Sequence, residues 1–227
     1  MRLVIANKLY SSWSMRPWLV MRAFDIPFEE TVIPLRQPDT AERIGRFSPT
    51  GKVPVLFDGE AVVWESLAII EHLAEAFPDR PIWPRERVAR AHARAISSEM
   101  HAGFQPLRQA CPMNLGKRFR TPPLDAGVTA AVARIEDLWA TSRARFGADG
   151  PFLLGAFSAA DAMYAPVATR LDSYQIPISA GSRAYIEAIF AHPAFTAWRA
   201  AALAEPWTIA DYEAGFEPTE VFHHPRA

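Results

Sequence analysis

The sequence predicts an α/β domain followed by an all-helical domain. Short apolar runs rich in β-branched residues, typical of strands, occur before a proline-rich segment at 77–84. Beyond it, apolar residues recur at helical spacing, and we expect no strand before the tail. A chain of 227 residues permits one large domain or two small ones. We therefore expect a first domain at 1–79 and a second at 85–227.

The first domain has the predicted element order β-α-β-α-β-β-α. The first three elements suit parallel pairing through a right-handed crossover. Asp58-Gly59 predicts a tight hairpin and therefore an antiparallel pair. A small mixed sheet with helices on both faces is the thioredoxin-like arrangement. The expected strands are 3–6, 29–33, 53–57 and 61–64, and the expected helices begin after Ser14, at Asp39 and at Ser66.

The second domain reads as antiparallel helices. Ser158 begins one of them, and Asp161 lies three residues later, which is a shorter variant of the capping box. Helices are expected at 87–108, 125–146, 158–171, 183–190 and 193–203.

Charge and cysteine content exclude several classes of protein. The 24 basic and 25 acidic residues nearly cancel, so no field attracts nucleic acid or an anionic membrane. No apolar run approaches the roughly 18–20 residues that span a bilayer, and the apolar run at the N-terminus is too short for a signal peptide. The single cysteine, Cys111, excludes an internal disulfide, and the histidines show no metal-ligand spacing. We expect a cytosolic protein without a metal.

The Val53-Pro54 step is the first candidate binding feature. Proline cannot donate to a strand ladder. If the bond is cis, the chain turns sharply and Val53 exposes its N–H and C=O. Those two groups suit antiparallel pairing with an extended peptide. An ordinary trans proline on an edge strand is the alternative reading of these residues.

The Glu65-Ser66 pair is the second feature. Ser66 lies at a helix start, where free N–H groups and the helix dipole favour an anion. Glu65 offers a carboxylate to an ammonium group. A ligand with a carboxylate and an ammonium on one carbon, such as a γ-glutamyl end, matches this pair. A plain helix cap remains the alternative.

Together these motifs carry a resemblance. The runs 51–56 (Gly-Lys-Val-Pro-Val-Leu) and 65–73 (Glu-Ser-Leu-Ala-Ile-Ile-Glu-His-Leu) resemble the glutathione-binding half of cytosolic glutathione transferases. The resemblance implies that Val53, before the cis Pro54, pairs with the cysteinyl backbone of glutathione. It implies that Glu65 and Ser66 hold the γ-glutamyl group. It also implies glutathione as co-substrate and a homodimer active in detoxification.

The same resemblance implies a catalytic hydroxyl or thiol after the first strand. Ser11 stands five residues before Arg16, which is similar to the serine-type zeta and tau classes. Ser12 is the alternative and fits theta-like spacing. Zeta enzymes carry a cysteine where this chain has Trp13, and the absence of cysteine here argues against the omega and beta classes.

The serine acts by donating a hydrogen bond. A free thiol has a pKa of about 8.5, so little thiolate exists at neutral pH. A hydroxyl that donates to the sulfur favours the thiolate. Tyr10 is a competing donor. Lys52, beside the turn, is a candidate partner for the glycyl carboxylate or the thiol region of glutathione.

We expect the thiolate to attack an electrophilic carbon of a hydrophobic or diacid second substrate. That substrate is expected to bind against the helix beginning near Arg87, where His101, Phe104, Gln105 and Arg108 are candidates. One alternative is a zeta-like, glutathione-dependent cis–trans isomerase of a maleyl-type diacid, served by Arg108 or Arg16. Another is a non-enzymatic glutathione-binding scaffold.

Overall fold

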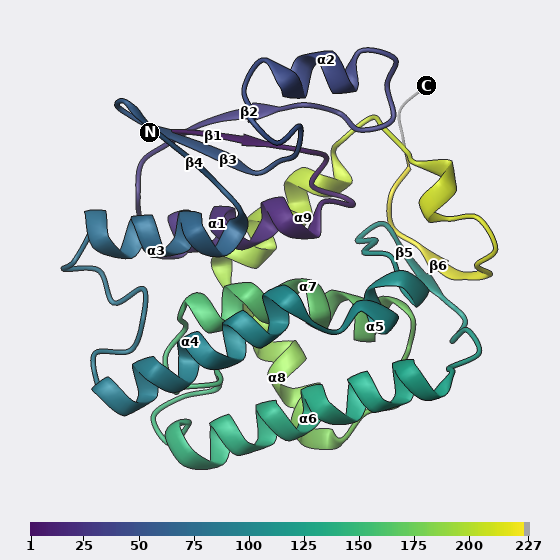
Figure 1. The fold of residues 1–227 in the computed structure, drawn as a ribbon. Helices are drawn as coiled ribbons and strands as arrows, with labels where there is room; N and C mark the ends of the chain where they lie inside the picture. Colours follow the sequence, from purple (N-terminus) through teal and green to yellow (C-terminus); the bar gives the residue numbers. More distant parts are fainter. Residues whose placement is uncertain (225–227) are drawn as a thin grey trace.

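Four short strands form a mixed sheet in the first part of the chain. The computed structural model describes residues 1–224 (Figure 1). The strands lie in the order β2-β1-β3-β4, with β1 parallel to β2 and antiparallel to β3, and β3 antiparallel to β4. The β3–β4 turn confirms the hairpin expected at Asp58-Gly59. The strand bounds are β1 (Arg2–Ile5), β2 (Glu29–Val32), β3 (Val55–Asp58) and β4 (Ala61–Trp64).

Alternation along β1 divides the apolar residues between two cores. Successive side chains of a strand point to opposite faces of the sheet. Leu3 and Ile5 join the main core, which continues into the helices. Val4 points the other way, into a smaller cluster that includes Ile44 and Val55. The sheet is therefore covered on both faces.

Three helices provide that cover. α1 (Ser12–Ala23) and α3 (Ser66–Ala76) lie on the face that looks toward the second part, and α2 (Thr40–Gly45) lies on the opposite face (Figure 1). The expected thioredoxin-like arrangement is confirmed.

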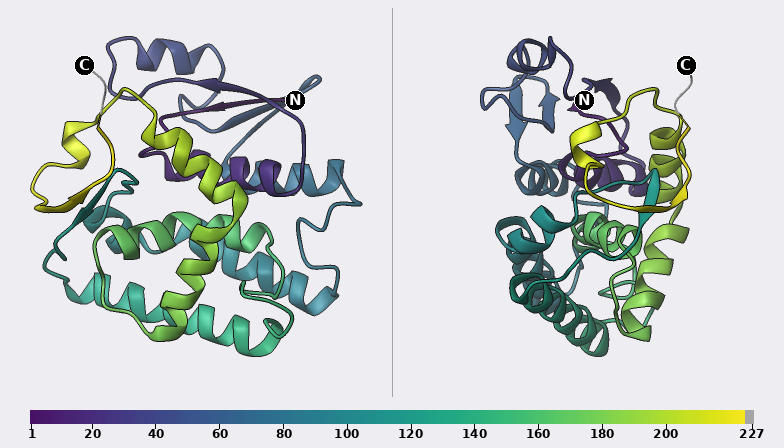
Figure 2. Two further views of the ribbon diagram at one scale, coloured as in Figure 1. Left: turned by 180° about the vertical axis from the view of Figure 1, so that it is seen from behind. Right: turned by 90° about the vertical axis from the view of Figure 1, so that its right-hand side faces the viewer.

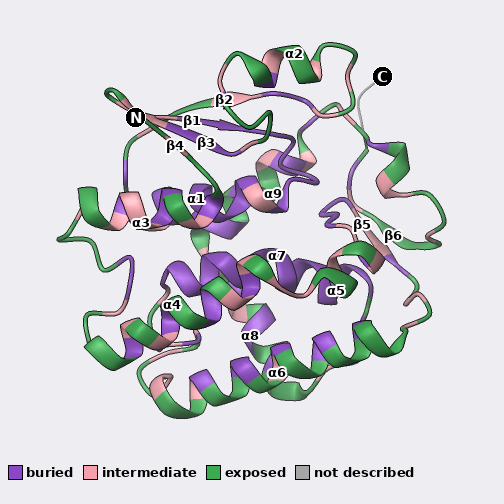
Figure 3. Cartoon of the chain, viewed as in Figure 1, coloured by how far each residue is buried: buried purple, intermediate pink, exposed green. Residues whose placement is uncertain are grey.

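The second part is built around a buried helix. α7 (Ala159–Ser173) is buried along almost its whole length, and it packs against α1 and α4 (Figure 3). After α9 (Pro193–Leu203) the chain runs back beside the sheet (Figure 2). The other helices are α4 (Arg87–Ala102), α5 (Gln105–Ala110), α6 (Ala126–Phe146), α8 (Ala180–Ala191) and α9 (Pro193–Leu203). None of the helices in residues 1–224 is both long and apolar enough to cross a membrane.

The capping box at the start of α7 is present and fully buried. The Asp161 carboxylate accepts the N–H (2.8 Å) and hydroxyl (3.0 Å) of Ser158, the Leu153 N–H (3.1 Å) and the Tyr185 hydroxyl (3.0 Å). A buried donor that loses its acceptor costs about 1–3 kcal/mol. Four donors on one side chain therefore fix the start of α7 against α8 and the preceding loop.

Several expected elements differ from the observed ones by one to three residues at an end, and two of these differences involve candidate residues. α1 starts at Ser12 and not after Ser14, with Ser11 as its N-cap. The third strand starts at Val55 and not at Val53, because Pro54 has no N–H to give to the ladder.

The single helix expected at 87–108 is wrong. It breaks into α4 and α5 at Gly103 and Phe104, where Phe104 takes the left-handed conformation with φ 56°. Pro106 explains the break, because a proline inside a continuous helix would lack its hydrogen bond and clash with the preceding turn.

The expectation of no strand before the tail is also wrong. β5 (Lys117–Phe119) pairs antiparallel with β6 (Pro218–Val221), which follows the short 3₁₀ helix η1 (Ala210–Tyr212). Both strands are too short, and β6 too exposed, to produce an alternating apolar pattern. Their pairing closes the segment 204–224 over the junction of the two parts.

Candidate active site

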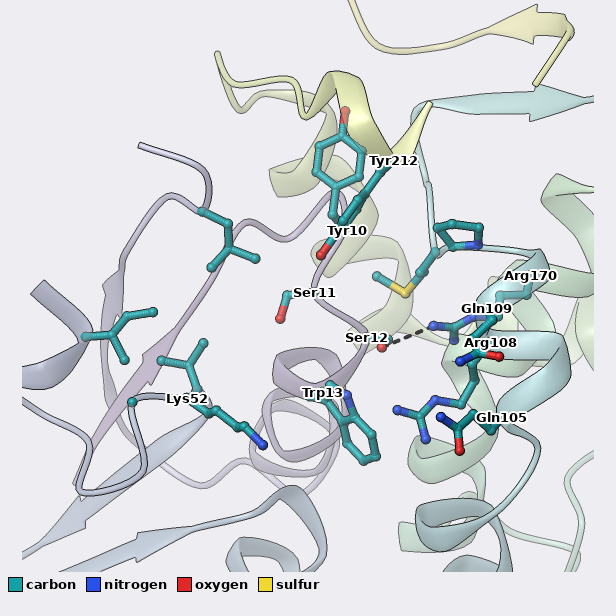
Figure 4. Close-up of a pocket in the computed structure, with 16 residues that line it drawn as sticks. Tyr10, Ser11, Ser12, Trp13, Lys52, Gln105, Arg108, Gln109, Arg170 and Tyr212 are labelled. Atoms are coloured by element: carbon teal, nitrogen blue, oxygen red, sulfur yellow. Dashed lines mark hydrogen bonds between the residues drawn. The ribbon is translucent and has the colours of Figure 1, made fainter. Parts of the chain in front are cut away.

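Two adjoining cavities lie where α1, the loop before Pro54 and α5 converge. The larger has a volume of about 490 Å³ and the smaller about 260 Å³. Trp13, Lys52, Val53 and Arg108 line both, so the two spaces are contiguous. Figure 4 shows the larger one, with Lys52 on one side and Arg108 on the other.

Ser11 and Ser12 both line the larger cavity, and both are largely buried. Ser11 is the N-cap of α1, yet its hydroxyl makes no capping bond. It donates instead to Ser14 Oγ (2.8 Å), which also accepts the Ala6 N–H (3.1 Å). The Ser12 hydroxyl accepts a hydrogen bond from Arg170 Nη2 (3.3 Å; Figure 4). The two neighbouring hydroxyls therefore have different partners, one neutral and one cationic.

Tyr10 also lines the cavity, but its hydroxyl is committed elsewhere. It donates to Glu213 Oε1 at 2.8 Å. Burial raises the pKa of Tyr10 well above its usual range, and the adjacent Glu213 carboxylate raises it further. Tyr10 therefore keeps its proton and directs it to the C-terminal segment.

The Val53-Pro54 bond is cis, as the sequence allowed. Val53 lines both cavities, and in residues 1–224 neither its N–H nor its C=O has a hydrogen-bond partner. Gly51, with φ 68°, makes the preceding turn, and Ser48 Oγ accepts the Lys52 N–H (3.2 Å). The turn therefore leaves the N–H and C=O of Val53 unpaired among the described residues, in the wall of the cavity, with the exposed Lys52 beside them.

Glu65 and Ser66 lie at the start of α3. Glu65 lines the smaller cavity with its side chain about half exposed, and its backbone φ of 68° is unusual for a residue with a side chain. Such conformations cost about 1–3 kcal/mol and gather at functional sites. Ser66 is fully buried, lines neither cavity, and its hydroxyl has no partner among the described residues.

His101 sits between Glu65 and Trp13. Its Nε2 lies 3.6 Å from Glu65 Oε2, and its ring meets the Trp13 ring edge-on at 5.1 Å. Burial, and then the nearby Arg16 charge, lowers the pKa of His101 below its usual value. The imidazole is therefore neutral at pH 7 and leaves the Glu65 carboxylate without a cationic partner.

Three arginines gather behind and beside Trp13. Arg16 and Arg108 stand over its ring at 4.0 and 4.5 Å from the ring centroid. Within the described chain, no carboxylate lies within 4.0 Å of Arg16, Arg108 or Arg170. Burial and then the Arg108 charge lower the pKa of Arg170 to about 10. Positive charge here is concentrated and unneutralised.

The arginines differ in access. Arg16 is fully buried, lines neither cavity, and its Nε and Nη1 have no partner in the part of the chain that is described. Arg170 donates to the carbonyls of Cys111 (2.9 Å) and Pro166 (3.1 Å). Arg108 lines both cavities, and no hydrogen bond of its side chain is found within residues 1–224.

Sequence reasoning named part of the lining of the larger cavity and missed the rest. Gln105 and Arg108 reach the larger cavity, as expected, whereas His101 packs behind Trp13 and Phe104 lies outside the lining. It missed Arg170 and Tyr212, which also line this space. The sequence pattern that could have identified Arg170 is an arginine among the mostly apolar residues of α7.

Neither a metal centre nor a reactive thiol is evident in the described residues. No group of three or more His, Cys, Asp and Glu side chains there is arranged to hold a metal ion. Burial raises the pKa of the Cys111 thiol to about 12, which leaves it protonated and unreactive.

Comparisons with known proteins identify the family. Two family models match the chain: "Glutathione S-transferase, N-terminal domain" over residues 10–76 and "Glutathione S-transferase, C-terminal domain" over residues 123–201. A curated relative, a probable maleylacetoacetate isomerase from Caenorhabditis elegans, is 37% identical over 103 residues, which cover 44% of this chain and 48% of the relative. The chain thus spans about half the length of that relative.

Solved structures share the fold. A glutathione transferase homologue from Burkholderia with bound glutathione superposes with a TM-score of 0.66 at 19% identity, covering 88% of this chain and 96% of that one. A bacterial maleyl pyruvate isomerase of the zeta class gives 0.65 at 22% identity, with 92% and 100% coverage. The two domain models match the sheet part and the helical part in turn, and the chain belongs to the cytosolic glutathione transferase superfamily.

Proposed function

We propose that this protein binds glutathione along the smaller cavity and activates its thiol beside Ser11 for attack on an electrophile in the larger one. The observation that carries the proposal is the free peptide edge of Val53 between Glu65 on one side and Ser11 on the other. One tripeptide can then span the Glu65 carboxylate, the Val53 edge and the Ser11 hydroxyl.

The binding groups follow from these contacts. The Val53 N–H and C=O pair with the cysteinyl residue, as a strand edge pairs with an added peptide. The γ-glutamyl carboxylate meets the first N–H groups of α3, where the helix dipole favours an anion. Its contact with Ser66 requires this buried hydroxyl to become accessible when glutathione binds. Glu65 receives the γ-glutamyl ammonium. Lys52, exposed at the mouth of both cavities, meets the glycyl carboxylate.

Ser11 is the proposed donor to the sulfur. Its hydroxyl has only a serine partner, whereas the Ser12 hydroxyl is held by Arg170. When a sulfur is present, Ser11 turns its hydrogen to it, and Ser14 donates to Ser11 in exchange. The three arginines add positive potential, which favours the thiolate over the thiol. Glutathione is a co-substrate here, and Ser11 forms no covalent bond.

Glutathione binding is tested with Ser66→Ala. We expect the dissociation constant for glutathione, measured by calorimetry, to rise about tenfold, because one hydrogen bond to a carboxylate contributes about 1.5–3 kcal/mol. Ser97→Ala is the matched control, since Ser97 is equally buried, has an unpartnered hydroxyl and lines neither cavity. Equal affinities for the two variants would contradict the assignment. No binding by the unaltered protein would contradict the proposed recognition of glutathione itself, whereas binding without conjugation would favour the glutathione-binding scaffold.

The choice between the serines is tested by conjugation kinetics. We expect Ser11→Ala to lower kcat/KM about 10- to 100-fold at pH 7, because the thiolate loses a charge-assisted hydrogen bond. Ser12→Ala should change it by less than about threefold, because Ser12 Oγ serves only Arg170. A larger loss for Ser12→Ala would transfer the role to that residue.

A second candidate reaction is glutathione-dependent isomerisation of a maleyl-type diacid. Arg108 favours it, because an unpaired guanidinium on the wall of the electrophile cavity recognises a carboxylate. Sulfur addition to the double bond, rotation and loss of glutathione then change the geometry of the diacid and regenerate the thiolate.

Arg108→Gln separates the two reactions. With maleylacetoacetate as substrate, we expect KM to rise about tenfold or more, because a charged hydrogen bond is lost. Turnover of a neutral chlorinated aromatic should fall by a smaller factor, because that substrate loses only the contribution of the Arg108 charge to the thiolate. Arg120→Gln, an exposed arginine paired with Glu217 (2.7 Å), is the control. Equal losses on both substrates would show that Arg108 does not read the diacid.

We also propose that two copies associate through exposed apolar residues of both parts. Val62 (39% exposed) and Trp64 (42%) lie on the edge strand β4, and Val88 (49%) lies on α4. Exposed apolar side chains on an uncovered sheet edge favour association.

Sedimentation velocity checks the association. We expect a dimer for the unaltered protein and a monomer for the double variant Val62→Glu with Val88→Glu, with unchanged circular dichroism. The buried charges destabilise the interface. A monomer in both samples rules out the proposal.

A further inference from the structure

The turn between β1 and α1 carries Ser11, and its peptide groups lie outside both elements. Ser11 N–H and Tyr10 N–H both donate to the Asn7 carbonyl, at 2.8 and 3.2 Å. The two preceding amides, those of Lys8 and Leu9, have no partner within the turn. Buried amides require partners, so these two must find them elsewhere.

One side chain supplies both. Glu205, just beyond α9, accepts the Lys8 N–H at 2.7 Å and the Leu9 N–H at 3.2 Å, one on each carboxylate oxygen. Glu205 is only 9% exposed. The carbonyls of the same two residues are satisfied from the second part as well, by Trp198 Nε1 (3.0 Å) and the Leu115 N–H (3.2 Å).

Glu205 has no cation of its own. Within residues 1–224, no Lys, Arg or His nitrogen lies within 4.0 Å of its carboxylate. The charged groups around it are Lys8, whose ammonium pairs with Glu30, and the Glu30 carboxylate. His223 donates Nε2–H to the Glu205 carbonyl (2.6 Å). Burial raises the pKa of Glu205, and the two amide bonds oppose that rise.

Burying a carboxylate without a cationic partner costs free energy, unless hydrogen bonds to its oxygens offset that cost. Its side-chain hydrogen bonds are the two amides that lie two and three residues before Ser11. A second tie lies next to Ser11, where Tyr10 donates to Glu213 (2.8 Å), and Glu213 is itself held by Lys117 Nζ (2.6 Å). The C-terminal segment therefore holds this turn at two points, through Glu205 and Glu213.

We propose that Glu205 is a positioning residue that fixes the Ser11 hydroxyl in the cavity from the far end of the chain. It lines neither cavity, so it touches neither thiol nor electrophile. Its carboxylate sets the path of the turn, and the path of the turn sets the direction of the Ser11 Cα–Cβ bond. The inference rests on the proposed role of Ser11.

The test is Glu205→Gln in the full chain. The amide is isosteric, but its NH₂ faces one of the two N–H donors and cannot accept from it. We expect the pKa of the bound glutathione thiol to rise by about one pH unit. This pKa is taken from the pH profile of kcat/KM for the electrophile, measured at saturating glutathione. Because less thiolate is present, kcat/KM is about tenfold lower at neutral pH. At a pH above the new pKa the thiol is ionised again, and kcat/KM returns to the value of the unaltered protein. Glutathione affinity should stay within about twofold, because Val53, Glu65 and Ser66 are unaltered.

Glu217→Gln is the matched control. It removes a carboxylate from the same segment, but one whose contacts are with Arg120 at the surface. We expect its pH profile to coincide with that of the unaltered protein. If Glu205→Gln does not give folded protein, Trp198→Phe carries the test, because it removes the bond to the Lys8 carbonyl of the same turn and keeps an aromatic ring in the core; the same rise in the thiol pKa is expected.

Two outcomes overturn the inference: an unshifted thiol pKa in Glu205→Gln, or an equal loss of kcat/KM at every pH. The latter indicates a merely structural role. Ser11→Ala, titrated in parallel, separates this inference from the proposed function. If Ser11→Ala leaves the thiol pKa unchanged, the role of Ser11 itself fails. If Ser11→Ala shifts it and Glu205→Gln does not, only the positioning role of Glu205 fails.

Discussion

The peptide groups of the turn between β1 and α1 are the constraint on which much of the molecule depends. The turn satisfies the Tyr10 and Ser11 amides itself, but the peptide groups of Lys8 and Leu9 bond neither within the turn nor to the sheet or α1. Burying an amide without a partner costs about 1–3 kcal/mol. The chain meets this demand by returning its C-terminal residues to the N-terminal strand, with Glu205 and Trp198 as the contacts. The sheet part alone would lack these partners.

The same demand acts at the junction of α1 and α7. Arg170 is buried in a helix made otherwise mostly of apolar residues, so its guanidinium must be hydrogen-bonded. It uses two carbonyls and the Ser12 hydroxyl. The Ser12 hydroxyl therefore takes part in the packing of α7 against α1. The Ser11 hydroxyl, in contrast, bonds within the described chain only to another serine, Ser14. Packing between the parts thus divides the two neighbouring hydroxyls into one structural and one available group.

Sequence patterns predicted the fold class because it depends largely on local chemistry. Apolar runs rich in β-branched residues, the Asp58-Gly59 turn and the Ser158–Asp161 box each act over a few residues, and the structure contains all three. The β5–β6 pair and the partners of Lys8 and Leu9 depend on residues about a hundred or more positions away, where periodicity carries no information. The break at Gly103 could have been predicted from the sequence, because Pro106 excludes a continuous helix through this position. The boundaries 1–79 and 85–227 and the roles of Lys52, Val53, Pro54, Glu65 and Ser66 stay predictions.

The arginines have two effects that differ in their reach. Positive potential falls off slowly in a partly buried site, so Arg16, Arg108 and Arg170 together favour a thiolate whatever the electrophile is. Recognition of a carboxylate needs direct contact with a free N–H fork. Arg16 is sealed behind Trp13, and two nitrogens of Arg170 are bound to carbonyls. The richness of the site in cations therefore does not by itself distinguish a transferase from an isomerase. That distinction depends on Arg108, whose guanidinium faces both cavities.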